Sequence, residues 1–466
     1  MNNKVISKPG QPDKKIQAEG FGAFETQGQR QTQEDTLVRE LFCDNELQNL
    51  TPEQIATRLA ITYRLLNARF KETLGKNSTD HGAGTTASTT VIQKKNLITA
   101  TLGDSIAFAV LYDNKNNVHV RRLNQTIISP KLPHEAQRIK DAGHKVVNDR
   151  IDGRLAVSRA IGDFYYDSAM SVTADVHITT IDKLAADVHV NIDQISKVQI
   201  ITTCDGFTEE SDYKHLEDSD KERKTRQEDY LKVFLTTILK NEPSELDIAE
   251  NLSRAAFKDG SQDNISVAVQ TIHPPYEVSC IMGIYDGHGG TDASHFVADH
   301  ILDVFEKQCT LTDDQLNKEE LSIWLTMYLG NEFQNQIIAL TKRKEFYFQT
   351  EAAKKEIETT INALTTIKNK ILAISYETDP TTAYIQNIKN VILAADPSIY
   401  KARGTFSIHR MLQRLMNWIE QYSSKATNEP NTPKVSSSGL FKTTTEKHID
   451  EILAKTNEVA SKSSKG

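Results

Sequence analysis

The stretch LITATLGDSIAFAVLYD, residues 97–113, contains two runs of strand type separated by three turn residues. Leu97–Leu102 and Ile106–Asp113 are rich in the apolar and β-branched residues that favour strands, whereas Gly103-Asp104-Ser105 is typical of a turn. Working outward in both directions, the sequence has four more runs of this kind: Val118–Leu123, Val198–Thr203, Ile265–Ile272 and Val278–Tyr285. We therefore expect β-structure to dominate residues 19–309.

Helical patterns are few in this part of the chain. Thr51–Leu74 has Pro52 at a plausible first helical position and apolar residues recurring at intervals of three and four. Gln227–Leu239 and Thr291–Phe305 are two further amphipathic stretches. Few helices beside many strands, without regular βαβ alternation, predict an α+β fold in which helices pack on antiparallel sheet.

The sequence divides into four parts. Residues 1–18 are polar and contain Pro9, Gly10 and Pro12, which predicts a flexible N-terminus. Residues 19–309 form the predicted α+β domain. Residues 310–423 read as an all-α domain, most clearly at Glu351–Tyr376 and again at Ile408–Tyr422. Residues 424–466 form a tail that is too polar to bury much, although Thr443–Val459 has the pattern of a short helix.

Composition excludes several classes of protein. The 466 residues carry a formal net charge of -8, and Lys and Arg are spread along the chain, so nucleic acid is not an expected partner. The four cysteines form no CxxC pair, which argues against a zinc knuckle or a disulfide framework and for a reducing cytosol. No run approaches the ~18 apolar residues of a membrane span, so we expect no membrane-spanning segment.

Four acidic clusters lie beside turns or strand-like runs. They are Glu34-Asp35, Asp205, Asp263 and Asp286. Taken singly, each has an ordinary explanation as a tight turn, a strand cap or surface charge. Several carboxylates around one pocket would repel each other unless cations neutralised them, and Mg²⁺ or Mn²⁺ prefers oxygen ligands. The combination therefore predicts a divalent metal site.

Seven sequence motifs relate this pattern of acidic residues to a known family. They are RQTQED (30–35), GTTA (84–87), LGDS (102–105), DGRLAVSRAIGD (152–163), CDG (204–206), GSQDNIS (260–266) and DGHGG (286–290). Together they resemble the motif set of the metal-dependent PPM-type, or protein phosphatase 2C, serine/threonine phosphatases over residues 20–305. The resemblance implies a sandwich of two antiparallel β-sheets flanked by helices, and hydrolysis of phosphoserine and phosphothreonine in proteins by a water that two metal ions activate.

The resemblance also implies roles for individual residues. Six would hold two Mg²⁺ or Mn²⁺ ions: Asp286 as the bridging carboxylate, Gly287 through its carbonyl, Asp205, Asp263, and the pair Glu34 and Asp35, largely through waters. Arg30 matches the arginine that binds phosphate, for which its permanently charged fork is apt. His288 matches the histidine that protonates the leaving oxygen, and its alternative reading is a turn histidine.

Other polar residues in these motifs have no catalytic role in this reading. A two-metal mechanism needs no protein nucleophile, and Ser105 and Ser158 lack the pattern of covalent catalysis. Asp104, Asp163 and Arg159 are interpreted as structural residues near the site.

The sequence departs from the family in two places. The DGHGG segment normally follows the Glu-Asp motif closely, yet here Val278–Cys309 comes after GSQDNIS, which indicates a transposed segment or a partial permutation. Such rewiring is feasible because a strand fills the same place in a sheet whichever loop delivers it. Ile127 falls where many members have an aspartate for a third metal, so that site is expected to be weak or absent. Glu209 could contribute a nearby carboxylate.

The main alternative function is a pseudophosphatase that acts as a binding module. The intact set of predicted ligands argues against it. The expected partner is a phosphorylated protein substrate, and recruitment of a protein partner is a hypothesis for the helical domain. Cytoplasmic localisation is the default, while the Ser- and Lys-rich tail resembles the secretion signals of bacterial effector proteins delivered into host cells.

Overall fold

The computed structural model describes most of the chain up to residue 394. The described residues are 4–6, 13–42, 47, 49–74, 82–213, 219–238, 243–312, 315–316, 318–319, 321–322, 325, 334–345, 350–372, 381–394 and 415. The chain divides into two units, one containing Met1–Thr310 and the other Leu311–Phe441.

Two six-stranded antiparallel sheets form the framework of the first unit. One has the order β1-β4-β16-β6-β7-β13 and the other β2-β3-β15-β14-β8-β9. The strands of the first sheet are β1 (Lys4–Ile6), β4 (Thr36–Leu41), β16 (Ser279–Tyr285), β6 (Ala87–Gln93), β7 (Asn96–Leu102) and β13 (Asp175–Thr180). Those of the second are β2 (Asp13–Ala18), β3 (Phe21–Thr26), β15 (Ile265–Ile272), β14 (Ile195–Thr203), β8 (Ile106–Asp113) and β9 (Val118–Arg122). The predicted α+β sandwich of two antiparallel sheets is confirmed.

Smaller strands and helices complete this unit. The short strands are β5 (Gly84–Thr85), β10 (Val146–Val147), β11 (Arg150–Ile151), β12 (Ile161–Gly162) and β17 (Gly287–His288). The α-helices are α1 (Pro52–Leu74), α2 (Pro133–Asp141), α3 (Ile181–Asp187), α4 (Glu209–Tyr213), α5 (Asp220–Ile238), α6 (Glu245–Asp259) and α7 (Asp292–Thr310). Three 3-10 turns span Phe164–Tyr166, Ile192–Gln194 and Asp205–Phe207.

The chain passes from one sheet to the other inside residues 97–113. Strand β7 belongs to the first sheet and β8 to the second, so the turn at Gly103-Asp104-Ser105 joins the two layers. Gly103 has φ +78°, a left-handed conformation that favours glycine. Leu97 from β7 and Ala107, Ala109 and Leu111 from β8 belong to the same buried core between the sheets. Both runs are thus held by the apolar burial that their composition predicts.

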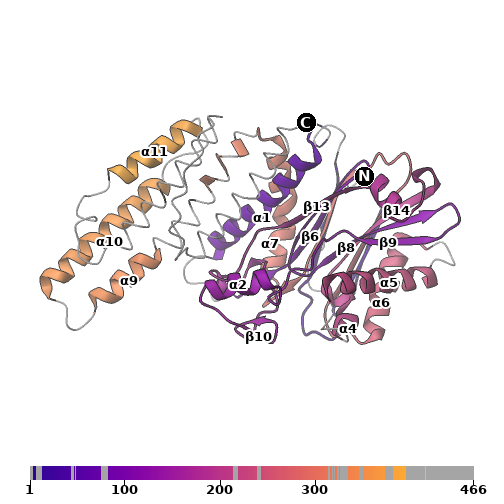
Figure 1. Ribbon diagram of the computed structural model, residues 1–466, viewed down its shortest axis with the longest axis horizontal. Helices are drawn as coiled ribbons and strands as arrows, with labels where there is room; N and C mark the ends of the chain where they lie inside the picture. The colour runs from indigo at the N-terminus through magenta and orange to yellow at the C-terminus, as the bar shows by residue number, and fades with distance from the viewer. Residues whose placement is uncertain are drawn as a thin grey trace. The chain divides into compact units, whose positions relative to one another are not determined.

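Helices cover the outer faces of the sandwich (Figure 1). Helices α1 and α7 pack together on the first sheet, and α5 and α6 pack on the second. Helix α6 begins with a capping box between Ser244 and Asp247, and its Ile248 and Leu252 belong to the buried core on the outer face of the second sheet. Each sheet is therefore buried on both faces, which explains why its central strands contain few exposed residues.

Strand β16 occupies an interior position despite its late place in the chain. It pairs antiparallel with β4, Tyr285 opposite Thr36, and on its other side with β6, Ile284 opposite Ser88. Cys280, Met282 and Ile284 face the core between the sheets and are fully buried. Alternate residues of a strand point to opposite faces, so Tyr285 faces the helix layer, where its hydroxyl lies 3.1 Å from Thr89 Oγ1. The nearly continuous apolar run reflects burial on both faces.

Several elements differ from the expectation. Composition predicts a flexible start at residues 1–18, but β1 and β2 within it pair at sheet edges, where β2 alternates exposed and half-buried residues. Helix α5 begins at Asp220, seven residues before the predicted start, because its polar first turn is held by hydrogen bonds rather than by apolar burial.

The described part of the second unit is helical. It contains α9 (Gln334–Lys344), α10 (Glu351–Leu372) and α11 (Thr381–Leu393). Helix α10 packs against the other two, and Ile357, Leu364, Ile367 and Ile371 of its predicted apolar stripe are buried. The predicted helices at Ile408–Tyr422 and Thr443–Val459, and the tail at 424–466, lie outside the described residues apart from Leu415. No helix among the described residues combines the length and apolarity required to cross a bilayer.

Candidate metal centre

Four of the predicted ligand positions lie where strands of both sheets begin or end. Asp205 follows β14 and Asp286 follows β16, while Asp263 precedes β15 and Asp35 precedes β4. Because β14 pairs antiparallel with β15, and β16 with β4, the end of one strand lies beside the start of its partner. The sheet topology thus brings together carboxylates that are far apart in sequence.

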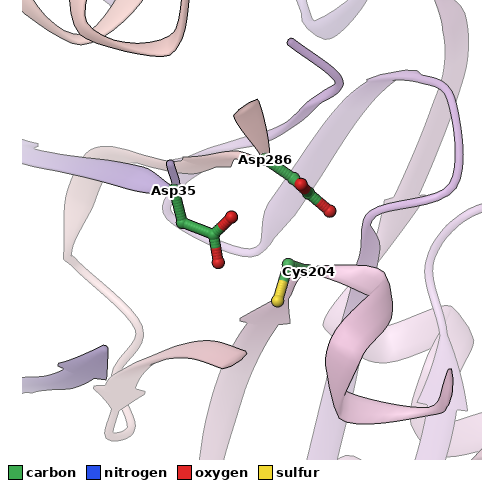
Figure 2. Close-up of side chains that lie close together, drawn as sticks. All are labelled: Asp35, Cys204 and Asp286. Atoms are coloured by element: carbon green, nitrogen blue, oxygen red, sulfur yellow. The ribbon is translucent and has the colours of Figure 1, made fainter. Parts of the chain in front are cut away.

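Asp35, Cys204 and Asp286 form the tightest group (Figure 2). One oxygen or sulfur atom from each lies within 4.8 Å of the others. Asp35 is 1% exposed, and its Oδ2 accepts a hydrogen bond of 2.7 Å from the Ser266 hydroxyl. Its Oδ1 is buried and has no hydrogen-bond partner. A buried carboxylate oxygen without a donor is costly, and a cation would satisfy it.

The electrostatics of the cluster favour a bound cation. Burial raises the pKa of Asp35 to about 7, and the charge of Asp263 adds to this effect. Burial likewise raises the pKa values of Asp205 and Asp286 well above the usual range, and these two carboxyl groups interact directly with each other. Divalent cations would relieve this repulsion, and the donor set of carboxylate oxygens suits Mg²⁺ or Mn²⁺. The residues present therefore fit the implied ions.

Cys204 belongs to the group by position but not by chemistry. Its thiol donates to the Asn264 carbonyl at 3.3 Å and accepts from the Ser266 backbone N–H at 3.2 Å. Burial raises the pKa of this thiol well above its usual value, so it stays protonated. A protonated thiol is a poor ligand for a hard cation. Cys204 instead holds the end of β14 against the start of β15.

Arg30 lies at the entrance of the cluster. Its guanidinium is paired with the Asp263 carboxylate, and its side chain is 57% exposed. Partial burial opposes its charge, but Asp263 first, then Asp205 and Asp286, outweigh that effect and raise the pKa of Arg30. A permanently charged group beside the acidic residues, with its other face open to solvent, can contact an incoming anion.

Asn264 fixes the loop that carries Arg30 and Glu34. Its side-chain amide donates to the carbonyls of Gln27 and Thr32, each at 2.9 Å, and its oxygen accepts from the Glu34 N–H at 2.9 Å. The loop is thus attached to the start of β15, next to Asp263.

Gly287 joins this loop to the Asp286 segment. A Cβ at Gly287 would collide with the Glu34 carbonyl oxygen and lie 2.8 Å from Ser294 Oγ. Ser294 at the start of α7 donates to the same Glu34 carbonyl at 2.5 Å. Only glycine permits this approach, which places the Glu34 backbone beside Asp286.

His288 is held by a residue that the sequence analysis interprets as structural. Its Nε2 lies 2.7 Å from Asp163 Oδ2, and Asp163 is 1% exposed. Burial opposes protonation of His288, yet the Asp163 carboxylate outweighs this effect and the pKa of His288 is raised. A Cβ at Gly84 would collide with both side chains, so this glycine leaves room for the pair. The GD at the end of DGRLAVSRAIGD is the sequence signal for Asp163.

Asp104 is a second residue that is interpreted from the sequence as structural near the site, and it acts on the acidic cluster. It is half-buried, burial raises its pKa, and its charge acts on Asp205. Its position in the turn between β7 and β8 adds one more carboxylate to the cluster. By contrast, Arg159 is structural as predicted: it pairs with Glu135 and donates to the Thr173 carbonyl at 3.0 Å.

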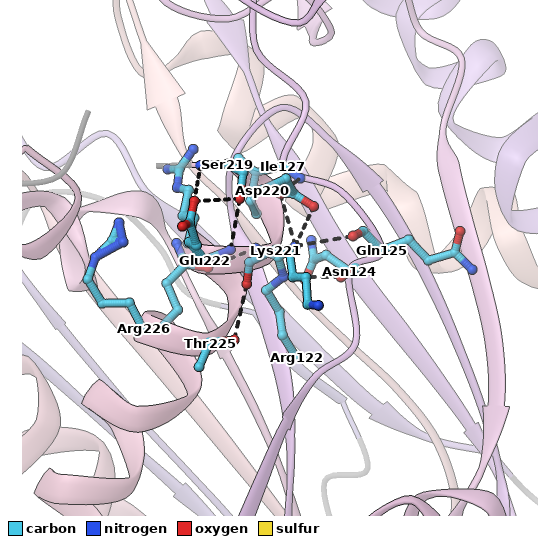
Figure 3. Close-up of polar contacts among 12 residues, drawn as sticks. Arg122, Asn124, Gln125, Ile127, Ser219, Asp220, Lys221, Glu222, Thr225 and Arg226 are labelled. Carbon is cyan, nitrogen blue, oxygen red and sulfur yellow. Dashed lines mark hydrogen bonds and ion pairs between the residues drawn. The ribbon is translucent and has the colours of Figure 1, made fainter. Parts of the chain in front are cut away.

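Ile127, the position at which a third metal site is expected to be weak or absent, lies among polar side chains (Figure 3). Ile127 is 2% exposed, and its backbone N–H lies 3.3 Å from Asp220 Oδ1. Both oxygens of Asp220 accept from the buried Arg122 guanidinium, at 3.1 and 3.2 Å. Glu209 accepts from Ser261 and from two backbone N–H groups of residues 262–263. Asp220 is thus bound through both oxygens, whereas the three hydrogen bonds to Glu209 all go to Oε2.

Comparisons with known proteins agree with these motifs. A model of the family "Protein phosphatase 2C" matches residues 14–265, more than half of the 466 residues. Protein phosphatase 2C homolog 1 of Saccharomyces cerevisiae is 27% identical over 182 residues, which cover 38% of this chain and 50% of that protein. Probable protein phosphatase 2C 59 of Arabidopsis thaliana is 34% identical over 147 residues, covering 31% and 44%. The chain thus spans half or less of the length of these relatives.

Solved structures of phosphatases also align with the chain. A phosphatase from Toxoplasma gondii aligns with 17% identity and a TM-score of 0.37, covering 60% of this chain and 99% of that one. The catalytic domain of the serine/threonine phosphatase PstP, solved with two manganese ions, aligns with 13% identity and a TM-score of 0.30, covering 57% and 99%.

Proposed function

The chain belongs to the protein phosphatase 2C family, and from this premise we propose that it hydrolyses phosphoserine and phosphothreonine in proteins with the help of two Mg²⁺ or Mn²⁺ ions. One observation carries the proposal. The carboxylates of Asp35 and Asp286, from two distant motifs, lie close together, and the half-buried Asp205 from a third motif interacts with Asp286, so that the group repels itself unless cations are present.

In this proposal the acidic residues hold the ions. Asp286, Asp205, Asp263, Glu34 and Asp35 would hold them with their carboxylates, and Gly287 would add its backbone carbonyl. When bound, such cations supply a nucleophile from water near neutral pH and neutralise phosphate charge.

Arg30 would bind the phosphate group. Its exposed guanidinium already lies against Asp263, at the margin of the proposed site. A planar fork with several donors can contact two phosphate oxygens at once. Binding there would hold the phosphorus over the carboxylate cluster.

His288 would donate a proton to the leaving serine or threonine oxygen. Asp163 accepts from Nε2, so Nδ1 is the nitrogen that remains for the substrate. The Asp163 carboxylate also favours the protonated ring, which is the form that an acid needs. We therefore assign Asp163 the role of positioning His288.

Three further parts of the hypothesis come from the sequence. They are the transposition of the DGHGG segment relative to the family, the recruitment of a protein partner by residues 310–423, and delivery of the chain into a host cell. The position of β16 between β4 and β6 supports the first, because it allows Asp286 to join the other ligands.

Turnover of a phosphothreonine peptide with and without Mn²⁺ tests the proposal. We expect hydrolysis that needs added Mg²⁺ or Mn²⁺ and stops with excess EDTA, because the proposed ligands are all oxygen atoms. Full activity in EDTA would contradict the two-metal mechanism. Metal binding without any turnover would favour the pseudophosphatase.

A further inference from the structure

A second group of reactive side chains lies outside the metal centre. Asp152 Oδ2 lies 2.7 Å from Nδ1 of His144, and Nε2 of the same ring lies 3.0 Å from the Ser168 hydroxyl oxygen. Because an ionised carboxylate can only accept, Nδ1 carries the proton and Nε2 is free to accept one from Ser168. The order Asp–His–Ser and the use of both ring nitrogens match the arrangement that activates a serine nucleophile.

The fold holds these three residues in place. Asp152 and Lys145 bond reciprocally: the Lys145 N–H donates to Asp152 Oδ1 at 2.9 Å, and the Asp152 N–H donates to the Lys145 carbonyl at 2.7 Å. The Tyr166 ring lies 6.1 Å from the His144 ring. Asp152 is the acidic residue that contacts the His144 ring.

A small separate core supports the segments that carry the group. Ile139, Ile151 and Ala169 are buried together, with Val146 and Tyr166 packed against them. Ile139 lies in α2 and its carbonyl accepts from the His144 N–H at 3.2 Å, Ile151 precedes Asp152, and Ala169 follows Ser168. The three side chains are thereby fixed by burial behind them, whereas the Ser168 side is exposed to solvent.

We propose that Ser168 is a nucleophile for acyl transfer, with His144 as its general base and Asp152 as the residue that orients the ring. In the first step the Ser168 oxygen bonds to the carbonyl carbon of an ester, and its proton passes to His144 Nε2. The bond from that carbon to the leaving oxygen breaks, the leaving group departs as an anion with the electron pair, and His144 releases the proton to solvent. Water then attacks the carbonyl carbon of the acyl-serine and passes a proton to His144 Nε2. The bond from that carbon to the Ser168 oxygen breaks, the acid is released, and His144 returns the proton to restore the Ser168 hydroxyl.

The groups present at the exposed Ser168 define the substrate class. The group supplies a nucleophile and a base, so the leaving group must depart without further help. Activated esters of short carboxylic acids meet this condition. The reaction requires no metal, which separates it from the proposed phosphatase activity.

The test uses p-nitrophenyl acetate with the full chain in excess EDTA. We expect a burst of p-nitrophenolate and an acetyl group on Ser168, located by mass spectrometry of proteolytic fragments. Ser168→Ala removes that acetyl group. His144→Ala slows acetylation of Ser168 by about 100-fold or more, the contribution of a positioned general base.

His119→Ala is the matched control. His119 is paired with Asp113, with 3.6 Å between Nε2 and Oδ2, but this Nε2 has no serine hydroxyl as a hydrogen-bond partner. Loss of His119 should therefore leave acetylation of Ser168 unchanged. Thermal melts establish that each variant is folded. If His144→Ala does not fold, Asp152→Asn replaces it and should also slow acetylation.

Two outcomes would overturn the proposal. One is no acetylation of Ser168 above the level of exposed serines elsewhere in the chain. The other is acetylation at the wild-type rate in the His144 variant, which would mean that the serine is not activated. Loss of phosphatase activity in any of these samples bears only on the metal centre.

Discussion

Replacing Asp286 should stabilise the metal-free protein but weaken its binding of metal ions. In Asp286→Asn the amide removes one of the buried, mutually repelling charges, so the metal-free variant should melt at a higher temperature than the wild type at neutral pH. The same change removes a ligand. Loss of a residue that merely supports a metal ligand costs about 10–100-fold in metal affinity, and we expect a larger loss here.

Calorimetric titration with Mn²⁺ and turnover of a phosphopeptide measure these effects. Turnover should fall by several orders of magnitude, with little rescue by more substrate. Near-normal Mn²⁺ affinity and turnover in Asp286→Asn would mean that the DGHGG segment is a structural turn in this protein.

Replacing Arg30 should lower catalytic efficiency without weakening metal binding. Arg30→Ala removes a charge-assisted contact to phosphate worth about 1.5–3 kcal/mol, or roughly 10- to 150-fold in catalytic efficiency. The carboxylates that hold the ions remain, so Mn²⁺ affinity should stay close to that of the wild type. Steady-state kinetics measure the catalytic efficiency and calorimetry on the same sample measures the Mn²⁺ affinity, so the two effects can be separated. An equal loss of metal affinity would place Arg30 among the groups that organise the ions.

At the scale of elements, β16 links the core to the site. Met282 is fully buried between the sheets, four residues before Asp286. Met282→Ala should lower the free energy of unfolding by about 2–5 kcal/mol, because it leaves a cavity in a packed core. Since the strand positions Asp286, Mn²⁺ affinity should fall as well.

Urea denaturation checks the Met282 prediction. Val233→Ala on α5 is the control, since Val233 is 65% exposed and its loss should change stability by no more than about 0.5 kcal/mol. If the two variants are equally stable, β16 does not pack in the interior as described.

At the scale of the whole molecule, the buried acids make stability depend on pH and metal together. The pKa of Asp35 is about 7 in the folded protein against an ordinary value of 3.8, and those of Asp205 and Asp286 are raised too. At pH values between the ordinary pKa of the unfolded state and the raised pKa of the folded state, the folded state binds more protons than the unfolded state. The free energy of unfolding therefore falls as the pH rises. We expect the metal-free protein to melt at a lower temperature at pH 7.5 than at pH 5.5.

Mn²⁺ should reverse this trend. It binds the ionised carboxylates of the folded state, so its stabilising effect should be largest at pH 7.5. Thermal melts at both pH values, with Mn²⁺ and with EDTA, measure it. A metal-free midpoint that rises between pH 5.5 and pH 7.5 would contradict the raised pKa values of these carboxyl groups in the folded protein.

The sequence by itself determined the class of fold and the proposed ligands. Period-two and continuous apolar runs such as LITATL and IAFAVLYD report burial, which depends on local composition. Motifs such as DGHGG and CDG report residue types whose chemistry suits a metal. Both kinds of signal lie within a few neighbouring positions, so they can be read without knowing the fold.

Only the tertiary structure decided which distant residues meet. A strand pattern shows which faces are buried but not which strand lies beside it, so the separation of β7 and β8 into different sheets was not predictable. Asp163 reaches His288 across 125 positions of sequence, and His144, Asp152 and Ser168 meet around a small core of their own. Such contacts depend on strand order, register and the close approach that Gly84 allows, which are properties of the folded chain as a whole.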